Sequence, residues 1–448
     1  MAGANLITLS EVLKEYYMGP IVDQLNKEVL FLTRLESRSE DLVGKRAFIP
    51  LAATRTGGIG ARPENGTLPA AGNLSYDKAV YDLKYLYGKA SVTGPSMAKT
   101  KSEAGAFLQA LKSELDMLRT DLRKDLARQI YGNGTGVIAG VASIAAASSG
   151  SQTITLDASS TGGNVFGDGQ DAIDKGQLYV GMVVDVKDGS NASVTNGEGL
   201  IITAVSASTP SITITNLAAG AVTTSSTSAF VIVRSGVKQY ASAATPSLSN
   251  PGTYALSDEV DGLQRIVSAT ATLGGIDPST STFWAANSVT PAATANASGT
   301  RAIAFDDIQI ALNKVRIAGG SPTAIVTTFG VQREIYGLFQ TQGIYTEQVM
   351  TPDYQAGFKT LMYSGLPIIA DLECPNGKMY ILDESTMKVF SDQDFHFLDA
   401  DGQTLRQSGD KDAFEAVMVR YMNVGATRRN NQVVIPNIAV DGGLDRGF

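Results

Sequence analysis

The chain has 448 residues, of which 43% are hydrophobic and 18% are charged. This composition supports two to four folded domains around an apolar core and excludes global disorder. The formal net charge is −8 and the lysines and arginines are scattered along the chain, which excludes sequence-specific nucleic-acid recognition, because such proteins present a basic face to the phosphates.

Residues 1–43 are predicted to form an N-terminal arm with two helical pieces. Thr8 and Glu11 have the spacing of a capping box, and Gly19-Pro20 ends the first piece. A second piece is predicted from about Ile21 to Ser37. No feature marks this arm as a globular unit of its own.

Residues 44–93 are predicted to form a long β-hairpin with a glycine-rich tip. Arg46 to Leu51 is strand-like, and residues 52–75 hold five glycines and two prolines. Residues alternate in polarity from Tyr76 to Val92, which is typical of a strand. The residues expected on one face of it are Ala79, Tyr81, Leu83, Tyr85 and Tyr87. Such a hairpin has too little core to stand alone, so it needs another surface, which is the first indication of an assembly protein.

Residues 100–131 are predicted to form one long amphipathic helix. Leucine and isoleucine recur at steps of three and four residues, which places them in one apolar stripe. The stripe consists of Leu108, Leu111, Leu115, Leu118, Leu122, Leu126 and Ile130. Thr100 and Glu103 supply a capping box, and Gly132-Asn133-Gly134 ends the helix. A coiled-coil dimer is an alternative, but the narrow stripe and the β-rich neighbours favour a helix packed along a sheet.

Residues 137–240 are rich in Ser, Thr, Gly, Ala and Val and are predicted to form a small β-rich domain. The β-prone runs are Ile154–Leu156, Leu178–Val186, Leu200–Val205, Ser211–Thr215 and Phe230–Val233. Gly181 and Asp188-Gly189 are suitable turn positions. Short strands without helical periods predict a small β-barrel or sandwich inserted into a larger domain.

From residue 241 onward the chain mixes helices and strands. Helices are predicted at Asp258–Ala271, Asp306–Ile317 and Val331–Leu338. Strands are predicted at Ala324–Thr328, Pro367–Ala370, Lys378–Leu382 and Met387–Phe390, followed by a closing antiparallel set at Phe414–Met422 and Gln432–Ile438. Asp401-Gly402 suits a hairpin turn. The predicted class is α+β with non-local strand pairing.

The sequence contains no motif of a known catalytic, cofactor-binding or metal site. The single cysteine, Cys374, allows neither an intrachain disulfide nor a thiolate metal cluster. The single histidine, His396, lies among Asp392, Asp394 and Asp399, but the spacing fits neither a zinc nor a calcium signature. We therefore expect no enzyme, no cofactor and no metal. We also expect no signal peptide and no membrane-spanning segment.

The order of these elements resembles the HK97-type fold of tailed-bacteriophage major capsid proteins. Gly60-Ala-Arg-Pro-Glu64 with Leu68-Pro69 looks like the tip of the family's extended loop. Gly365 to Asp371 and Met379 to Asp383 look like strands that end its axial domain, and Phe414 to Arg420 with Arg428 and Arg429 resembles its closing strands. The cues cover most of the chain outside residues 137–240.

The resemblance implies a division of the chain into six parts. These are an N-terminal arm (1–43), the extended-loop hairpin (44–93), a peripheral domain with a spine helix (94–136), an inserted β-rich domain (137–240), an axial domain (241–390) and closing β-strands (391–448).

The resemblance also implies what the chain does and what it meets. It implies self-assembly into pentamers and hexamers of an icosahedral shell around double-stranded DNA, with a separate scaffolding protein, a portal and decoration proteins as further partners. The expected location is the virion, and the host cytoplasm during assembly. Inter-subunit contacts are expected from the charged residues Arg55, Arg62, Glu64 and Lys78. Some relatives weld subunits through a Lys–Asn bond, for which Lys78 or Lys84 with Asn430 or Asn431 are candidates.

Two rival interpretations stay open. An encapsulin-like nanocompartment would share the fold and enclose protein cargo instead of DNA. A β-rich phage tail or adhesin protein would explain the Ser/Thr/Gly-rich strands, but the spine-like helix and the lack of short repeats disfavour it.

Overall fold

A computed structural model describes residues 30–36, 39–41, 46–54, 56–94, 104–147, 150–157, 169–187, 194–197, 199–215, 221–222, 230–234, 259–296, 299–341, 361–398, 406–407 and 412–440. These residues fall into two units. One contains the described parts of 87–122 and 397–418, and the other contains those of 29–86, 123–396 and 419–448. The predicted features at Thr8, Glu11, Thr100, Glu103 and Asp401-Gly402 lie outside the described residues.

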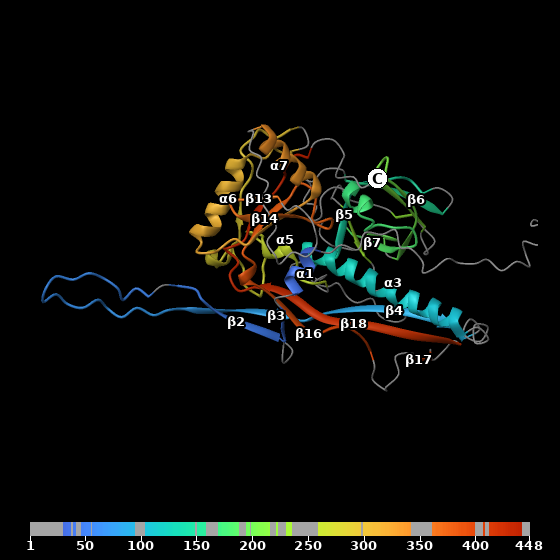
Figure 1. Cartoon of the computed structure of the whole chain (residues 1–448), viewed down its shortest axis with the longest axis horizontal. Coiled ribbons are helices and arrows are strands. Elements are labelled where there is room, and N and C mark those ends of the chain that lie inside the picture. The colour runs from blue at the N-terminus through green and yellow to red at the C-terminus, as the bar shows by residue number, and fades with distance from the viewer. Residues whose placement is uncertain are drawn as a thin grey trace, which may run out of the picture. The chain divides into compact units, whose positions relative to one another are not determined.

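The second unit contains a six-stranded mixed sheet with the order β11-β19-β15-β12-β14-β13. Two of its strands, β13 and β14, are labelled in Figure 1. Its strands are β11 (Asn287–Ser288), β12 (Ala324–Thr327), β13 (Met362–Tyr363), β14 (Leu366–Ala370), β15 (Met379–Leu382) and β19 (Val433–Ile435). Helices α6 (Phe305–Ile317) and α7 (Phe329–Thr341) share an apolar core with this sheet. Ile308, Leu312 and Val315 of α6 are buried, as their spacing predicted.

A second sheet has the order β1-β16-β18-β17, and β4 also pairs with β18. Its strands are β1 (Ser39–Asp41), β4 (Lys84–Thr93), β16 (Met387–Phe397), β17 (Arg406–Gln407) and β18 (Ala413–Ala426). The predicted pairing of the two closing strands is wrong, because β18 belongs to this sheet whereas β19 pairs with β11 and β15. The polar residues between β18 and β19 connect the two sheets. The apolar pattern of a strand predicts that the strand is buried, but it does not predict which other strand it pairs with.

Six strands within residues 137–234 form a closed barrel with the order β10-β5-β6-β9-β8-β7. They are β5 (Val137–Ile144), β6 (Ser151–Leu156), β7 (Val183–Lys187), β8 (Leu200–Ser206), β9 (Ser211–Thr215) and β10 (Phe230–Arg234). The barrel has an apolar core of its own, which includes Ile154, Ile202 and Ile214. The sequence did not predict β5 or the short helix α4 (Gly169–Asp174). The strand predicted from Leu178 begins only at Val183, because Gly181 makes a turn with a φ of +89°.

The predicted long helix is α3 (Ala104–Tyr131). Leu122, Leu126 and Ile130 of its apolar stripe are buried, and Gly134 follows its end with a φ of +81°. Within the first unit, a Cβ on Gly88 of β4 would lie 2.5 Å from the Leu122 side chain. This close approach is that of a helix packed along a strand, which agrees with the prediction.

The helix predicted at Asp258–Ala271 is wrong, because the described residues there contain only the single turn α5 (Leu263–Ile266). Gly262 precedes this turn in extended conformation and lies against the end of α3, where a Cβ would come within 2.4 Å of the Gln129 carbonyl oxygen. Tertiary contact has therefore overridden local helix propensity. The remaining short helices are α1 (Leu30–Glu36), which lies within the second predicted helical piece of the arm, and the 3-10 turns η2 (Thr282–Trp284) and η3 (Glu384–Thr386).

The hairpin consists of β2 (Arg46–Ala52) and β3 (Tyr76–Asp82). The single strand predicted from Tyr76 to Val92 is wrong, because the chain breaks at Leu83 into β3 and β4. The break shifts the alternation by one residue. Ala79 and Tyr81 are buried as predicted, but Leu86 is buried after the break while Tyr85 and Tyr87 are exposed. A one-residue shift exchanges the two faces of a strand.

Candidate functional site

The described residues contain no candidate metal centre, and the two residues singled out in the sequence, Cys374 and His396, lie in ordinary structural surroundings. Among them, no group of three or more His, Cys, Asp or Glu side chains could hold a metal ion. Cys374 is buried, and this burial raises the pKa of its thiol well above the usual value, so the reactive thiolate is disfavoured. His396 is partly exposed, and its Nδ1 lies 2.9 Å from the carbonyl oxygen of Asp394. Across the described ranges, no helix is both long enough and apolar enough to cross a membrane. The candidate site considered below is the exposed surface of the hairpin.

Strands β2 and β3 pair in a regular antiparallel register from Arg46 opposite Asp82 to Ala52 opposite Tyr76. Beyond this ladder the two arms of the tip stay side by side (Figure 1). The Thr54 and Ser75 hydroxyls are 2.9 Å apart, and Thr56 donates a hydrogen bond to the Gly72 carbonyl at 3.1 Å. A Cβ on Gly72 would lie 2.4 Å from the Gly57 nitrogen. The glycines of the tip thus allow two backbone arms to approach too closely for side chains.

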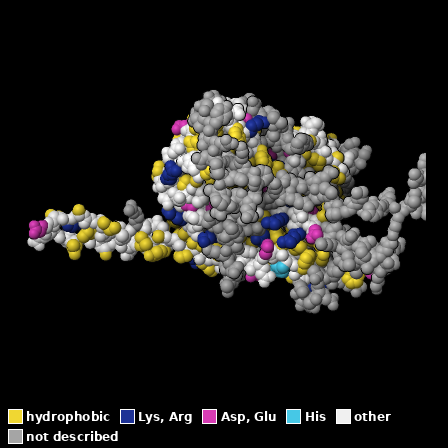
Figure 2. Space-filling model, in the orientation of Figure 1, with side chains coloured by type: hydrophobic (Ala, Val, Ile, Leu, Met, Phe, Trp, Pro, Cys, Tyr) yellow, Lys and Arg dark blue, Asp and Glu magenta, His cyan; other side chains and the backbone are white. Residues whose placement is uncertain are grey.

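Large apolar side chains lie exposed on this hairpin. Ile59 and Leu68 in the tip are 80% and 82% exposed. On the strands, Phe48 and Tyr76 are also mostly exposed. Figure 2 shows apolar side chains along the projecting hairpin, together with charged groups. Apolar side chains gathered on one narrow element are typical of an interaction surface.

The structure places three of the four predicted contact residues on the exposed surface of the hairpin. Arg62 and Glu64 flank Pro63 in the tip, whereas Lys78 lies on β3 opposite Pro50. The Lys78 ammonium group lies 6.0 Å from the centre of the Phe48 ring. Arg55 lies outside the described residues. The inter-subunit role of all four stays a prediction.

The root of the hairpin is fixed by apolar packing around Tyr81. The Tyr81 ring stacks on Phe390 with 5.4 Å between the ring centres. Its hydroxyl donates to the Ala426 carbonyl at 2.9 Å and accepts from the Ala426 amide at 3.2 Å. Burial raises the pKa of the Tyr81 phenol well above its usual value, so the hydroxyl stays protonated and able to donate. The backbone of Val80 also donates to the Gly274 carbonyl at 2.9 Å.

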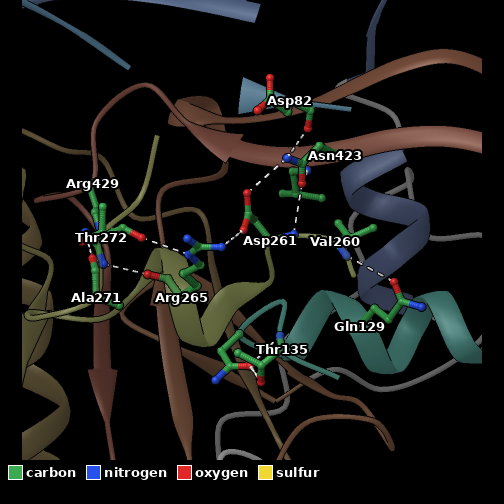
Figure 3. A network of polar contacts seen from close by, with 12 residues as sticks. Asp82, Gln129, Thr135, Val260, Asp261, Arg265, Ala271, Thr272, Asn423 and Arg429 are labelled. Carbon is green, nitrogen blue, oxygen red and sulfur yellow. Dashed lines mark hydrogen bonds and ion pairs between the residues drawn. The ribbon is translucent and has the colours of Figure 1, made fainter. Parts of the chain in front are cut away.

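A polar network continues this root into the interior (Figure 3). The Asn423 amide donates to the Asp82 carbonyl at 2.7 Å and to the Asp261 carboxylate at 3.1 Å. Its own side-chain oxygen accepts from the Asp261 backbone at 3.0 Å. Arg265 contacts Asp261 at 2.5 Å and the Thr272 carbonyl at 2.9 Å. The last residue of β3 is thereby linked to β18 and to the segment around α5.

Arg429 holds that segment from the other side. It is fully buried and donates to the carbonyl oxygens of Arg265, Ile266 and Ala271, each at 2.7 Å. Burial lowers the pKa of Arg429 to about 10, and the guanidinium still carries its charge at neutral pH. The planar guanidinium group holds its N–H donors in a fixed fork. It can therefore bind three carbonyl oxygens at once, which suits an arginine better than a lysine at this position.

Sequence reasoning found the hairpin but not its anchor. Asp261 and Arg265 fall within the wrongly predicted helix, and Arg429 entered the sequence analysis with Arg428 only through the resemblance to the family's closing strands. The one available signal was Asn423, a polar side chain between Met422 and Val424 in an apolar strand. Such a residue in a buried strand requires hydrogen-bonding partners.

Comparison with known proteins adds evidence at the level of fold. No family model matches the sequence, and no curated protein matches it. The chain is similar to one described as the capsid asymmetric unit of cyanophage A-1(L), with 13% identity, coverage of 97% of this chain and 99% of that chain, and a TM-score of 0.58. It is also similar to a chain of Mycobacterium phage Bobi (8% identity, coverage of 97% and 99%, TM-score 0.45) and to the SrpI encapsulin of Synechococcus elongatus PCC 7942 (7% identity, coverage of 99% and 98%, TM-score 0.47).

The similarity to the cyanophage chain extends over nearly the full length of both chains. The overall fold of this chain therefore agrees with the fold that the sequence resemblance predicted. The chain has the HK97-type fold of phage capsid proteins.

Proposed function

We propose that this chain is the major capsid protein of a tailed bacteriophage. It assembles into pentamers and hexamers that form an icosahedral shell around a double-stranded DNA genome. The observation that carries this proposal is an exposed apolar hairpin on a capsid fold. A hairpin that leaves Ile59 and Leu68 in solvent gains stability when a second copy of the chain covers it.

The wider assignment follows from the same proposal. In this proposal the chain has six functional segments, with boundaries after residues 43, 93, 136, 240 and 390. The barrel of residues 137–234 forms the core of the inserted domain. The partners are further copies of the chain, a scaffolding protein, a portal and decoration proteins. The DNA inside is enclosed without sequence-specific contacts, in keeping with the net charge of −8. The role is structural and not enzymatic, and the final location is the virion.

Electron microscopy of the purified full chain, expressed with and without its scaffolding protein, tests the proposal. Closed icosahedral shells are the expected result. Fibres would favour the tail or adhesin interpretation, and dispersed monomers at high concentration would refute a shell protein. Shells that enclose a co-expressed protein in their native host, and no DNA, would favour a nanocompartment.

Charge reversal in the tip tests the predicted inter-subunit contacts. Arg62→Glu with Glu64→Arg changes two exposed side chains, so the free energy of unfolding should change by less than about 0.5 kcal/mol. Shell yield should nevertheless fall. Each reversed side chain then has the same sign as the group that it contacts on the neighbouring subunit, so that attraction becomes repulsion. Unfolding in urea and shell counting by microscopy measure the two effects. A normal yield of shells from the double reversal would contradict the assignment.

A further inference from the structure

The barrel and the rest of its unit have separate apolar cores. We call the rest of the described unit the body; it includes the six-stranded sheet, the hairpin, helices α1, α5, α6 and α7, the end of α3 and the loop of residues 371–378. Among the described residues, no buried apolar side chain belongs both to the barrel core and to either core of the body. The contacts that join the barrel to the body in this structure are hydrogen bonds between polar groups.

That polar contact lies at α4 and the turn after it. Lys175 pairs with Asp171 at 2.7 Å and donates to the Cys374 carbonyl of the body at 2.6 Å. The Asp171 carboxylate accepts from the Asn376 backbone of the body at 3.2 Å. The side chains of Lys175 and Asp171 are only 7% and 6% exposed. This buried ion pair lies within the α4 segment, and each of its two members also makes a hydrogen bond to the body.

A second contact and the attachment of the loop complete the junction. Gln177 after α4 donates to the Glu373 carboxylate at 2.9 Å. The loop that carries Glu373 is held in the body by Asp371, which accepts from the backbone of Phe31 at 3.1 Å and from the backbone of Glu373 at 3.0 Å. On the other side, Ala172 of α4 packs in the barrel core. One short segment thus has an apolar side in the barrel and a polar side on the body.

Opening this junction differs physically from unfolding either part. Separation of apolar surfaces exposes hydrocarbon to water, whereas separated polar groups exchange protein hydrogen bonds for hydrogen bonds to water. The pair is stable only while both charges are present, because a single buried charge without its partner is strongly unfavourable. Loss of one charge should therefore open the junction and leave both apolar cores intact.

We propose that α4 and the turn after it form a charge-dependent latch, and that breaking the pair of Lys175 with Asp171 releases the barrel from the body as a folded unit. The latch rests on contacts within one chain and is independent of the proposed capsid function.

Hydrogen exchange of the full chain, followed by mass spectrometry, tests the latch with the variant Lys175→Met. Methionine keeps the length of the side chain but removes the ammonium group that contacts both the Asp171 carboxylate and the Cys374 carbonyl. We expect at least tenfold faster exchange in residues 169–178 and 371–378. Exchange in barrel strands β6, β8 and β9 and in body strands β12 and β15 should stay within a factor of two of the parent chain.

The matched control is Lys314→Met, the same change at a lysine of α6 whose ammonium donates to the Ser288 carbonyl at 2.8 Å. It should leave exchange at the latch unchanged. Gln177→Ala is a milder second variant, because it removes the contact with Glu373 and keeps the ion pair. It should accelerate exchange in the same two segments by about threefold.

Three results would overturn the latch. Unchanged exchange at both segments in Lys175→Met would show that the pair holds nothing. Equal acceleration of barrel and body strands would show one cooperative unit. If Lys175→Met does not fold at all, unchanged latch exchange in Gln177→Ala would refute the proposal in the same way.

Discussion

Gly425 in β18 shows how a single residue fixes the root of the hairpin. A Cβ at this position would lie 2.7 Å from two atoms of the Tyr81 ring and 3.0 Å from the Phe390 ring. Both rings are buried and stack on one another, so neither has room to move. The absence of a side chain at 425 is thus a condition for packing the hairpin strand against β16 and β18.

We expect Gly425→Ala to lower the free energy of unfolding by about 1–3 kcal/mol, the usual cost of overpacking a core. Gly337→Ala in helix α7 is the matched control, because a Cβ there meets no atom within 4 Å. That control should be neutral or stabilising by about 0.5–1 kcal/mol, since alanine favours helix. Urea unfolding of both variants decides the question, and equal effects would contradict the packing argument.

Lys378, in the loop that receives the latch, gives a pH-dependent prediction. Burial lowers the pKa of Lys378 from 10.5 to about 8. Between these pH values the unfolded chain binds more protons at this lysine than the folded chain does, so its contribution to stability rises with pH. The variant Lys378→Met lacks this contribution.

The stability of Lys378→Met relative to the parent chain should therefore be greatest below about pH 8. It should decline by up to about 1.4 kcal/mol per pH unit above that value. The comparison with the parent cancels other groups whose pKa values are raised by burial and not by Lys378, such as Tyr131 and Tyr380. Urea unfolding of both chains at pH 7, 8, 9 and 10 measures it. A stability difference that does not vary with pH would contradict the assigned pKa.

At the scale of elements, the hairpin combines a well-paired base with a tip that has few internal contacts. Its ladder from Arg46 to Ala52 fixes the register, and an exposed ion pair joins Arg46 to Asp82 at 2.5 Å. Surface pairs of this kind contribute little to stability. We therefore expect the exposed apolar side chains of the tip to contribute to the free energy of assembly and to contribute little to the free energy of folding.

The double variant Ile59→Ser and Leu68→Ser tests that view. Both side chains are more than three-quarters exposed, so the free energy of unfolding should change by less than about 0.5 kcal/mol. If a neighbouring copy buries them, each truncation costs about 1.5–3 kcal/mol per contact, and shell assembly should fail. Analytical ultracentrifugation of the purified chain measures assembly.

Thr67→Ser with Ala70→Ser is the control for this variant, because both positions are exposed in the same tip and neither is a large apolar residue. It should assemble as the parent chain does. Normal assembly of the Ile59→Ser and Leu68→Ser chain would show that these side chains are not covered in a shell.

At the scale of the whole molecule, the chain divides its apolar residues among several cores. The barrel core stands apart from the two cores of the body. Polar contacts at α4 join the barrel to the body, and a polar network around Asn423 joins segments within the body. Polar junctions hold a defined geometry and can be broken without exposing hydrocarbon.

The sequence by itself determined the elements whose periodicity is long and regular. The stripe of α3, the apolar face of α6, the strand Ser211–Thr215 and the glycine-tipped hairpin were all predictable, because each is encoded in residues adjacent along the chain. Together with their order they sufficed to predict the capsid fold.

Tertiary structure alone decided which strands pair, where the hairpin strand breaks and which polar residues are buried. β18 and β19 carry similar apolar patterns yet belong to different sheets, and the helix expected at Asp258–Ala271 yields to the close approach of Gly262 and the end of α3. Arg429 and Lys175 look like surface residues in the sequence, because the carbonyl groups that they contact at Arg265 and Cys374 lie 164 and 199 residues away. Local propensities are too weak to specify such contacts; burial and hydrogen bonding between distant segments select them.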